Sequence, residues 1–171
     1  MKTTLPVRAL FAAAALLALG QPLRSAAADQ PRATVTFENP EKFTDVKDSQ
    51  TGTDKGRDHY LNELRKLVVE EADRLLPAGR KLSMNFTDID LAGDYLPSMP
   101  ANRDIRVMKD IYIPRMKFSY TITDDSGAVV KEGQETLSDM NYLNTMRLIG
   151  RGEELFYDKE MLRDWLRKAL R

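Results

Sequence analysis

The chain of 171 residues contains no cysteine, one histidine and one tryptophan. Without cysteine the fold has no disulfide and no thiol nucleophile, so burial of apolar side chains must supply its stability. Because His59 is the single histidine, the usual zinc sites of clustered His and Cys ligands cannot be built within one chain. Only metal ions that prefer oxygen ligands remain candidates.

Long hydrophobic runs are also scarce, and the clearest lies at the N-terminus. A basic start precedes an apolar run of about eleven residues, 9–19, and small residues occupy 25–28. The run is too short for the roughly twenty residues of a membrane-spanning helix, but this order of segments is typical of a secretory signal peptide. We therefore expect cleavage near Ala28, removal of residues 1–28, and a periplasmic mature protein without an integral membrane span.

The chain lacks an excess of charge of one sign. Its 26 basic and 26 acidic residues balance, and residues 1–28 hold three of the basic residues and no acidic one, so the mature chain carries a net charge of −3. Nucleic-acid-binding domains carry a basic excess, so we predict no nucleic-acid partner. The remaining residues, 29–171, have the length of a single domain with one core.

Two segments have the apolar spacing of amphipathic helices. The first, 57–76, repeats apolar residues every three or four positions and is followed by Pro77, which cannot continue a helix. The second runs from Asp158, which we predict to be the N-cap, to Leu170, and its apolar stripe contains Trp165.

Four segments have the features of β-strands. Residues 33–37 and 81–91 alternate β-branched or apolar residues with polar ones, 116–123 alternate strictly, and 128–137 follow a turn that contains glycine. Polar and charged residues on both faces of the last segment indicate an edge strand. Residues 43–58 are polar and turn-rich, so we expect a mobile surface loop there. The prediction is an α+β fold, with a single, mostly antiparallel four-stranded sheet and two helices on one face.

Several sequence motifs occur along the chain. They are VTFENPEKFTD at 35–45, TDIDLAG at 87–93, VMKDIYIPR at 107–115, LSDMNY at 137–142 and DWLRK at 164–168. In this order they resemble the bacterial family known as domain of unknown function 3016, over essentially all of residues 33–170. The resemblance implies export from a Gram-negative bacterium and a single domain. It brings no activity, cofactor or catalytic residue to this chain, and we predict no cofactor.

The clearest candidates for chemistry are Asp88 and Asp90. If their strand kept strict alternation, both carboxylates would point into the apolar layer, so a bulge, the end of the strand or a cationic partner must intervene. Arg106 and Arg115 lie on the segment expected to return beside them. We favour structural ion pairing for this group, since such networks perturb carboxylates as readily as active sites do.

A cation site is the sharper alternative, because Asp88, Asp90 and Asp94 offer oxygen ligands to Ca²⁺ or Mg²⁺. The spacing does not match an EF-hand: with Asp88 first, Gly93 is sixth but Met99 is twelfth, where an acidic residue belongs. The metal content of this group stays open. A hydrolase in which Asp88 and Asp90 act as acid and base, or bind a metal ion, is also left open.

His59 could be read as part of a Ser-His-Asp triad. The chain contains no Gly-x-Ser-x-Gly sequence, which places the nucleophile in many such hydrolases. We interpret His59 as a solvated residue near the start of the first helix.

The segment 92–104 is long, contains two prolines and carries aromatic and methionine side chains, which suit a partner surface. The same side chains could instead fold over the core. Together with the edge strand, this segment favours a noncatalytic module that binds another periplasmic or outer-membrane protein. A small-ligand carrier, which needs a cavity between the helices and the sheet, is a further alternative. The predicted binding residues are Tyr95, Leu96, Met99, Asp88, Asp90, Asp110 and Arg115.

Overall fold

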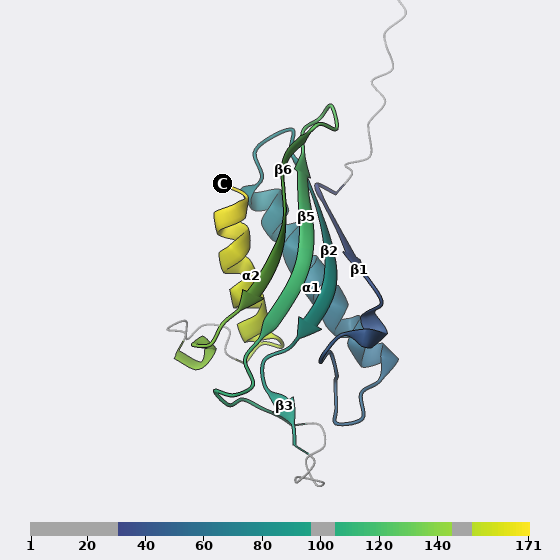
Figure 1. The fold of residues 1–171 in the computed structure, drawn as a ribbon, viewed down its shortest axis with the longest axis vertical. Helices are drawn as coiled ribbons and strands as arrows, with labels where there is room; N and C mark the ends of the chain where they lie inside the picture. The colour runs from purple at the N-terminus through teal and green to yellow at the C-terminus, as the bar shows by residue number, and fades with distance from the viewer. Residues whose placement is uncertain (1–30, 97–104, 145–151) are drawn as a thin grey trace, which may run out of the picture. The chain divides into compact units, whose positions relative to one another are not determined.

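Within residues 31–96, 105–144 and 152–171, which the computed structural model describes, four strands pair into one sheet of order β1-β2-β5-β6 (Figure 1). The strands are β1 (Ala33–Phe37), β2 (Lys81–Asp90), β5 (Arg115–Thr123) and β6 (Val129–Ser138). β1 runs parallel to β2, and the other neighbours are antiparallel. The predicted mostly antiparallel four-stranded sheet is confirmed, with one parallel pair that the sequence did not indicate.

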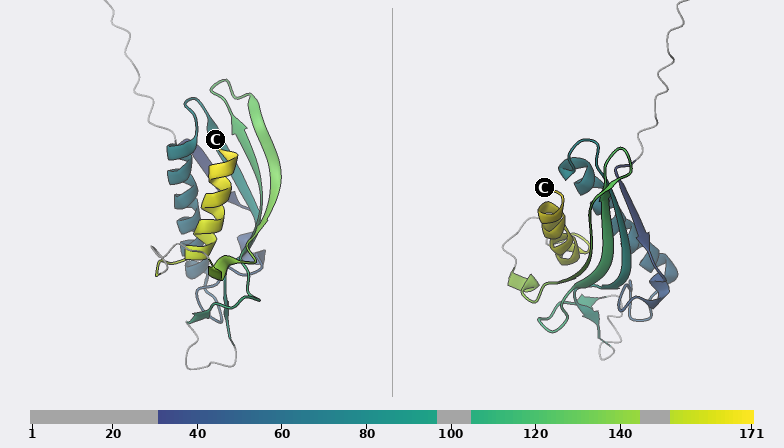
Figure 2. Two further views of the ribbon diagram at one scale, coloured as in Figure 1. Left: turned by 90° about the vertical axis from the view of Figure 1, so that its left-hand side faces the viewer. Right: turned by 45° about the horizontal axis from the view of Figure 1, so that its top comes forward.

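Both helices, α1 (Asp54–Leu75) and α2 (Phe156–Ala169), lie on the same face of this sheet, as predicted (Figure 2). α1 connects β1 to its parallel neighbour β2, a connection that needs a crossover. Short 3₁₀ turns occupy Pro40–Lys42 and Tyr142–Asn144. A second sheet pairs β3 (Asp94–Tyr95) with β4 (Arg106–Val107), and β3 lies in the segment 92–104, for which the sequence predicted no strand.

The core forms between the helices and the inner face of β2 and β5. Cross-strand pairs of large apolar side chains fill this face, and α1 and α2 cover them. Trp165 of α2 contacts Phe118 and Tyr120 edge-on, with ring centres 4.7 and 5.0 Å apart. The paired residues are Leu82 with Ile122, Met84 with Tyr120, and Phe86 with Phe118.

A β-bulge in β2 decides where its carboxylates point. The register against β5 shifts between Phe86 and Asp88, so Ile89 takes the inward position and is fully buried. Asp88 and Asp90 therefore stay partly exposed on the other face. A bulge was one of the three arrangements expected from the sequence, with the end of the strand and a cationic partner. It avoids burying two unpaired charges.

The start of α2 differs from the prediction. The helix begins at Phe156, and its N-cap is Leu155, which has a left-handed backbone with φ of 57°. Asp158 lies inside the first turn and is buried, so its predicted role as N-cap is wrong. Its carboxylate bonds to a distant backbone amide instead.

The loop expected over 43–58 is anchored, and its last residues belong to α1. Phe43 and Val46 are buried in the core, so this segment is not the purely surface loop that the sequence predicted. Asp48 accepts hydrogen bonds from the nitrogen and hydroxyl of Thr53 at 2.9 and 2.8 Å, and Thr53 caps α1. Two apolar residues, eleven and eight positions before the first residue of α1, were too few to produce a periodic signal.

Strand β6 lies at the edge of the sheet, as predicted. Most of its side chains are exposed, including those of Val129 and Val130. Among the described residues, no helix is both long enough and apolar enough to span a membrane.

Candidate functional site

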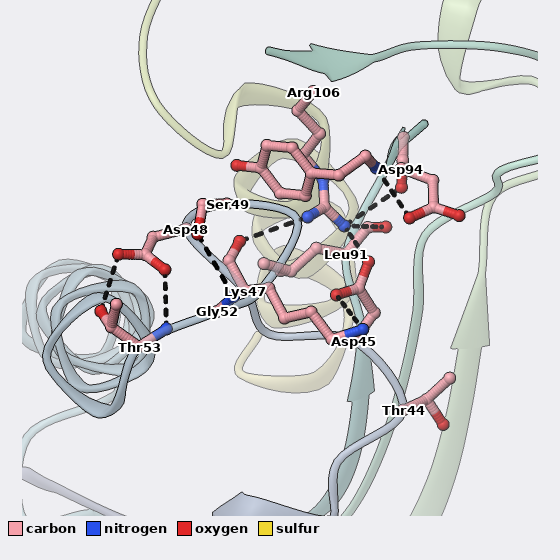
Figure 3. Close-up of polar contacts among 12 residues, drawn as sticks. Thr44, Asp45, Lys47, Asp48, Ser49, Gly52, Thr53, Leu91, Asp94 and Arg106 are labelled. Atoms are coloured by element: carbon pink, nitrogen blue, oxygen red, sulfur yellow. Dashed lines mark hydrogen bonds and ion pairs between the residues drawn. The ribbon is translucent and has the colours of Figure 1, made fainter. Parts of the chain in front are cut away.

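Arg106, in β4, connects several backbone segments beyond the end of β2 (Figure 3). Its Nη2 donates to Asp45 Oδ2 at 2.6 Å and to the carbonyl oxygens of Leu91 and Gly93 at 3.0 and 3.1 Å. Its Nε donates to the carbonyl oxygen of Ala92 at 2.7 Å. One side chain thus ties β4 to the turn after β2 and to the loop before α1.

The Arg106–Asp45 ion pair is largely shielded from water. Both side chains are 11% exposed, and the guanidinium carbon lies 5.2 Å from the centre of the Tyr95 ring. Asp45 is fixed by its own backbone, which donates to Ile89 O at 3.0 Å and accepts from Leu91 N at 3.1 Å. Removing one partner of such a pair leaves a buried charge uncompensated, at a cost of about 3–5 kcal/mol.

Asp158 holds the same turn from the side of α2. Its carboxylate accepts a hydrogen bond from Ala92 N at 3.0 Å, and the residue is 2% exposed. Burial raises the pKa of Asp158 to about 7, although the Ala92 hydrogen bond and the charge of Arg106 act in the opposite direction. The backbone of Ala92 is therefore held at its oxygen by Arg106 and at its nitrogen by Asp158.

Asp88 makes a separate set of contacts. It accepts hydrogen bonds from the nitrogen and hydroxyl of Thr44 at 2.9 and 3.1 Å, and its other partner is Lys117 Nζ at 3.3 Å. Burial alone would raise the pKa of Asp88, but these hydrogen bonds lower it below its ordinary value. Its contacts are those of a structural ion pair, with Lys117 in place of the arginines that the sequence suggested.

Asp90 opens onto a cleft of about 230 Å³ beside the Arg106 network. Asp45, Asp94, Lys47 and Arg115 also line it. Burial, followed by repulsion from Asp45, raises the pKa of Asp90, while Arg115 lowers it. The cleft is smaller than the roughly 300–1,000 Å³ of typical small-molecule sites, so it would accept only a small group.

The two carboxylates proposed for chemistry do not meet in one site. Asp88 faces Thr44 and Lys117, whereas Asp90 lines the cleft. Across the three described ranges, no group of three or more histidine or acidic side chains is placed to hold a metal ion.

A family model described as "Protein of unknown function (DUF3016)" matches residues 31–168. The chain belongs to this family. The match runs from β1 almost to the end of α2, and it includes Arg106, Asp45 and Asp158. The resemblance identified from the sequence motifs is therefore confirmed. No curated protein and no solved structure matches the chain.

The predicted binding residues of this DUF3016 protein have different environments. Tyr95 is 7% exposed and packs beside Arg106, which corresponds to the alternative in which it folds over the core. Leu96 is half-buried, Asp110 and Arg115 are exposed, and Met99 lies outside the described residues. The binding role of these residues stays a prediction.

His59 lies on the exposed side of α1, where its Nε2 is 2.7 Å from Glu154 Oε2. Its side chain is 56% exposed. These contacts agree with a solvated residue on the helix surface.

The sequence indicated Arg106 as a possible partner of the Asp88–Asp90 group and Asp158 as a helix cap, but it did not predict that the two hold one turn. Asp158 did carry a signal, because it is spaced four residues from Leu162 and eight from Leu166 and so shares the apolar stripe of α2. An acid on such a stripe needs a buried partner. Arg106 carried no comparable signal, since its partners Asp45 and Leu91 are distant in the sequence or bind through their backbone.

We predict that Asp158→Asn changes how stability depends on pH. The raised pKa means that folded Asp158 keeps its proton after the unfolded chain has lost it, so the contribution of Asp158 to stability falls as the pH rises from about 4 to about 7. Asparagine cannot ionise but still accepts from Ala92 N. Urea unfolding at pH 4.5, 6 and 8 should show the stability of the variant, relative to the natural protein, rising by on the order of a few kcal/mol. Parallel curves would contradict this role of Asp158.

Proposed function

We propose that this protein is exported, cleaved near Ala28, and acts in the periplasm as a noncatalytic binding module for another envelope protein. The arrangement of basic, apolar and small segments over residues 1–28 supports export. Strand addition at β6 is the proposed mode of binding, in which a partner strand joins the sheet by main-chain hydrogen bonds.

The observation that carries the proposal is the open edge of β6. This strand has ten residues and pairs with β5 on one side, while none of the described strands pairs with its other side. An edge of this length presents a row of backbone donors and acceptors to any extended chain.

The hydrogen bonds to β5 show which backbone groups of β6 point toward β5 and which point outward. Asp139 N donates to Pro114 O at 3.3 Å, just beyond the paired residues of β5 and β6. Hydrogen-bonded and non-hydrogen-bonded pairs alternate along an antiparallel ladder. Counting back by twos from Asp139, the groups of the odd-numbered residues face β5, and those of Glu132, Gln134 and Thr136 face outward.

The opposite edge of the sheet is less available. β1 has five residues, and Arg65 of α1 reaches over it, with Nε 3.5 Å from Val35 O and the guanidinium 5.0 Å from the centre of the Phe37 ring. Arg32, just before β1, donates to Leu76 O at 2.8 Å. These contacts favour β6 as the edge that receives a partner.

The test uses the full-length chain in cells, with a photo-crosslinking amino acid at Gln134. We expect a crosslinked species whose own chain begins at Asp29 by mass spectrometry, and no such species from the same probe at Ser83, on the outer face of β2. Thr136→Pro removes an outward N–H without breaking the ladder to β5, so it should strongly reduce the crosslink, whereas Thr136→Ala should preserve it.

Two results would count against this proposal. One is crosslinking from Gln134 that Thr136→Pro leaves unchanged, and the other is a probe at Gln134 that captures nothing. An uncut N-terminus would contradict export.

The alternative is a hydrolase that depends on carboxylates or a divalent metal. One observation favours it: the pKa of Asp88 is lowered while that of Asp90 is raised, as in acid–base pairs. Against it, Asp88 does not line the cleft, and its oxygens are occupied by hydrogen bonds from Thr44 and Lys117.

The hydrolase alternative predicts that Asp90→Asn abolishes an activity measured on chromogenic esters, phosphates and glycosides, with and without Mg²⁺. Asp73→Asn, on the exposed surface of α1 and outside the cleft, serves as the control. If the natural protein hydrolyses none of these substrates, or if the Asp90 variant keeps the activity, the alternative loses its support.

A further inference from the structure

Resting on the proposed strand addition, we infer that the occupant of the β6 edge is an isolated extended segment of a partner protein, with basic side chains opposite Glu132 and Glu135. The side chains along β6 define this chemistry, and the position of α2 defines the form of the partner.

Helix α2 restricts what can approach β6. Figures 1 and 2 show α2 in the helix layer on the β6 side of the sheet, and Lys131 Nζ donates to Ala169 O near the end of α2 at 3.0 Å. A partner sheet with its own helix layer on that face would collide with α2. A single extended segment carries no such layer, so it can pair with β6 beside the helix.

The charged side chains of β6 differ in whether they have a partner within the described parts of the chain. Lys131 is engaged by Ala169 O and lies 6.0 Å from the centre of the Tyr120 ring. In contrast, Glu132 and Glu135 form no ion pair with any residue in the described parts of the chain. Opposite charges facing each other across strands stabilise pairing and like charges oppose it. Basic residues at the two facing positions therefore fit this edge.

Gly133 lies between these two acids and marks an apolar position. It faces inward opposite Tyr120, whose ring would lie 3.0 Å from an added Cβ, and Trp165 packs on that ring. A partner residue opposite Gly133 meets no side chain from β6 itself. An apolar side chain there can reach toward the two aromatic rings.

The direction of the partner strand decides the order in which its residues face β6. Antiparallel pairing is the more stable arrangement per residue. Read from N to C, an antiparallel partner then presents a basic residue to Glu135, any residue to Gln134, an apolar residue to Gly133 and a basic residue to Glu132.

The test places such a segment next to β6 by a covalent tether. The strand Val-Thr-Lys-Thr-Val-Lys-Thr is added after Arg171 of the mature chain through a Gly-Ser linker of about twelve residues, long enough to span β6. The control strand carries Glu at both Lys positions. Hydrogen exchange of the Glu132, Gln134 and Thr136 amides and the fluorescence of Trp165 report docking.

We expect the Lys strand to slow exchange of the outward amides about tenfold more than the Glu strand. In a chain with Glu132→Lys and Glu135→Lys, the preference should reverse, while Glu70→Lys on the exposed side of α1 should leave it unchanged.

The outcomes separate this inference from the proposed function. Equal protection by both strands would overturn the charge pattern but leave strand addition standing. No protection by either strand would overturn both. If light scattering finds the untethered chain dimeric, with its outward amides already protected, the occupant is a second copy and the inference fails.

Discussion

The sheet has one apolar face, and the arrangement of the molecule follows from covering it. Leu82, Met84 and Phe86 of β2 and their partners on β5 point to the same side, so both helices must lie there. No described helix lies against the other face (Figure 2). Arg65 of α1 also donates a hydrogen bond to the outer edge of β1. The backbone N–H and C=O groups that no described strand pairs with therefore lie mainly along β6.

A second constraint applies where β2 ends. Arg106 has to be paired because it is largely buried, and Asp45 together with backbone carbonyl groups provides this pairing. Asp158 holds the same turn from α2. The network places Asp90 on the wall of a small cleft, while the bulge before Asp88 keeps both carboxylates out of the core. The contacts of Asp88 are those of a structural ion pair, and the cleft beside Asp90 has room only for a small group.

Local sequence patterns predicted the elements that local physics controls. The alternation over 116–123 and the spacing over 57–76 each bury one face, so the strand and the helix could be recognised without knowing their partners. A bulge near Asp88 was one of three arrangements that the sequence left open, because strict alternation would bury charges. The parallel pairing of β1, the β3–β4 sheet and the Arg106 network depend on contacts between segments far apart in the chain, and no local pattern encodes them.

The account depends most directly on β6 being an open edge. Amide hydrogen exchange measured by NMR on the isolated chain of residues 29–171 tests this residue by residue. The account predicts an alternating pattern, with slow exchange at Gly133, Glu135 and Leu137 and fast exchange at Glu132, Gln134 and Thr136. Uniformly slow exchange along the strand would mean that another segment or another copy already covers this edge, and would contradict the account.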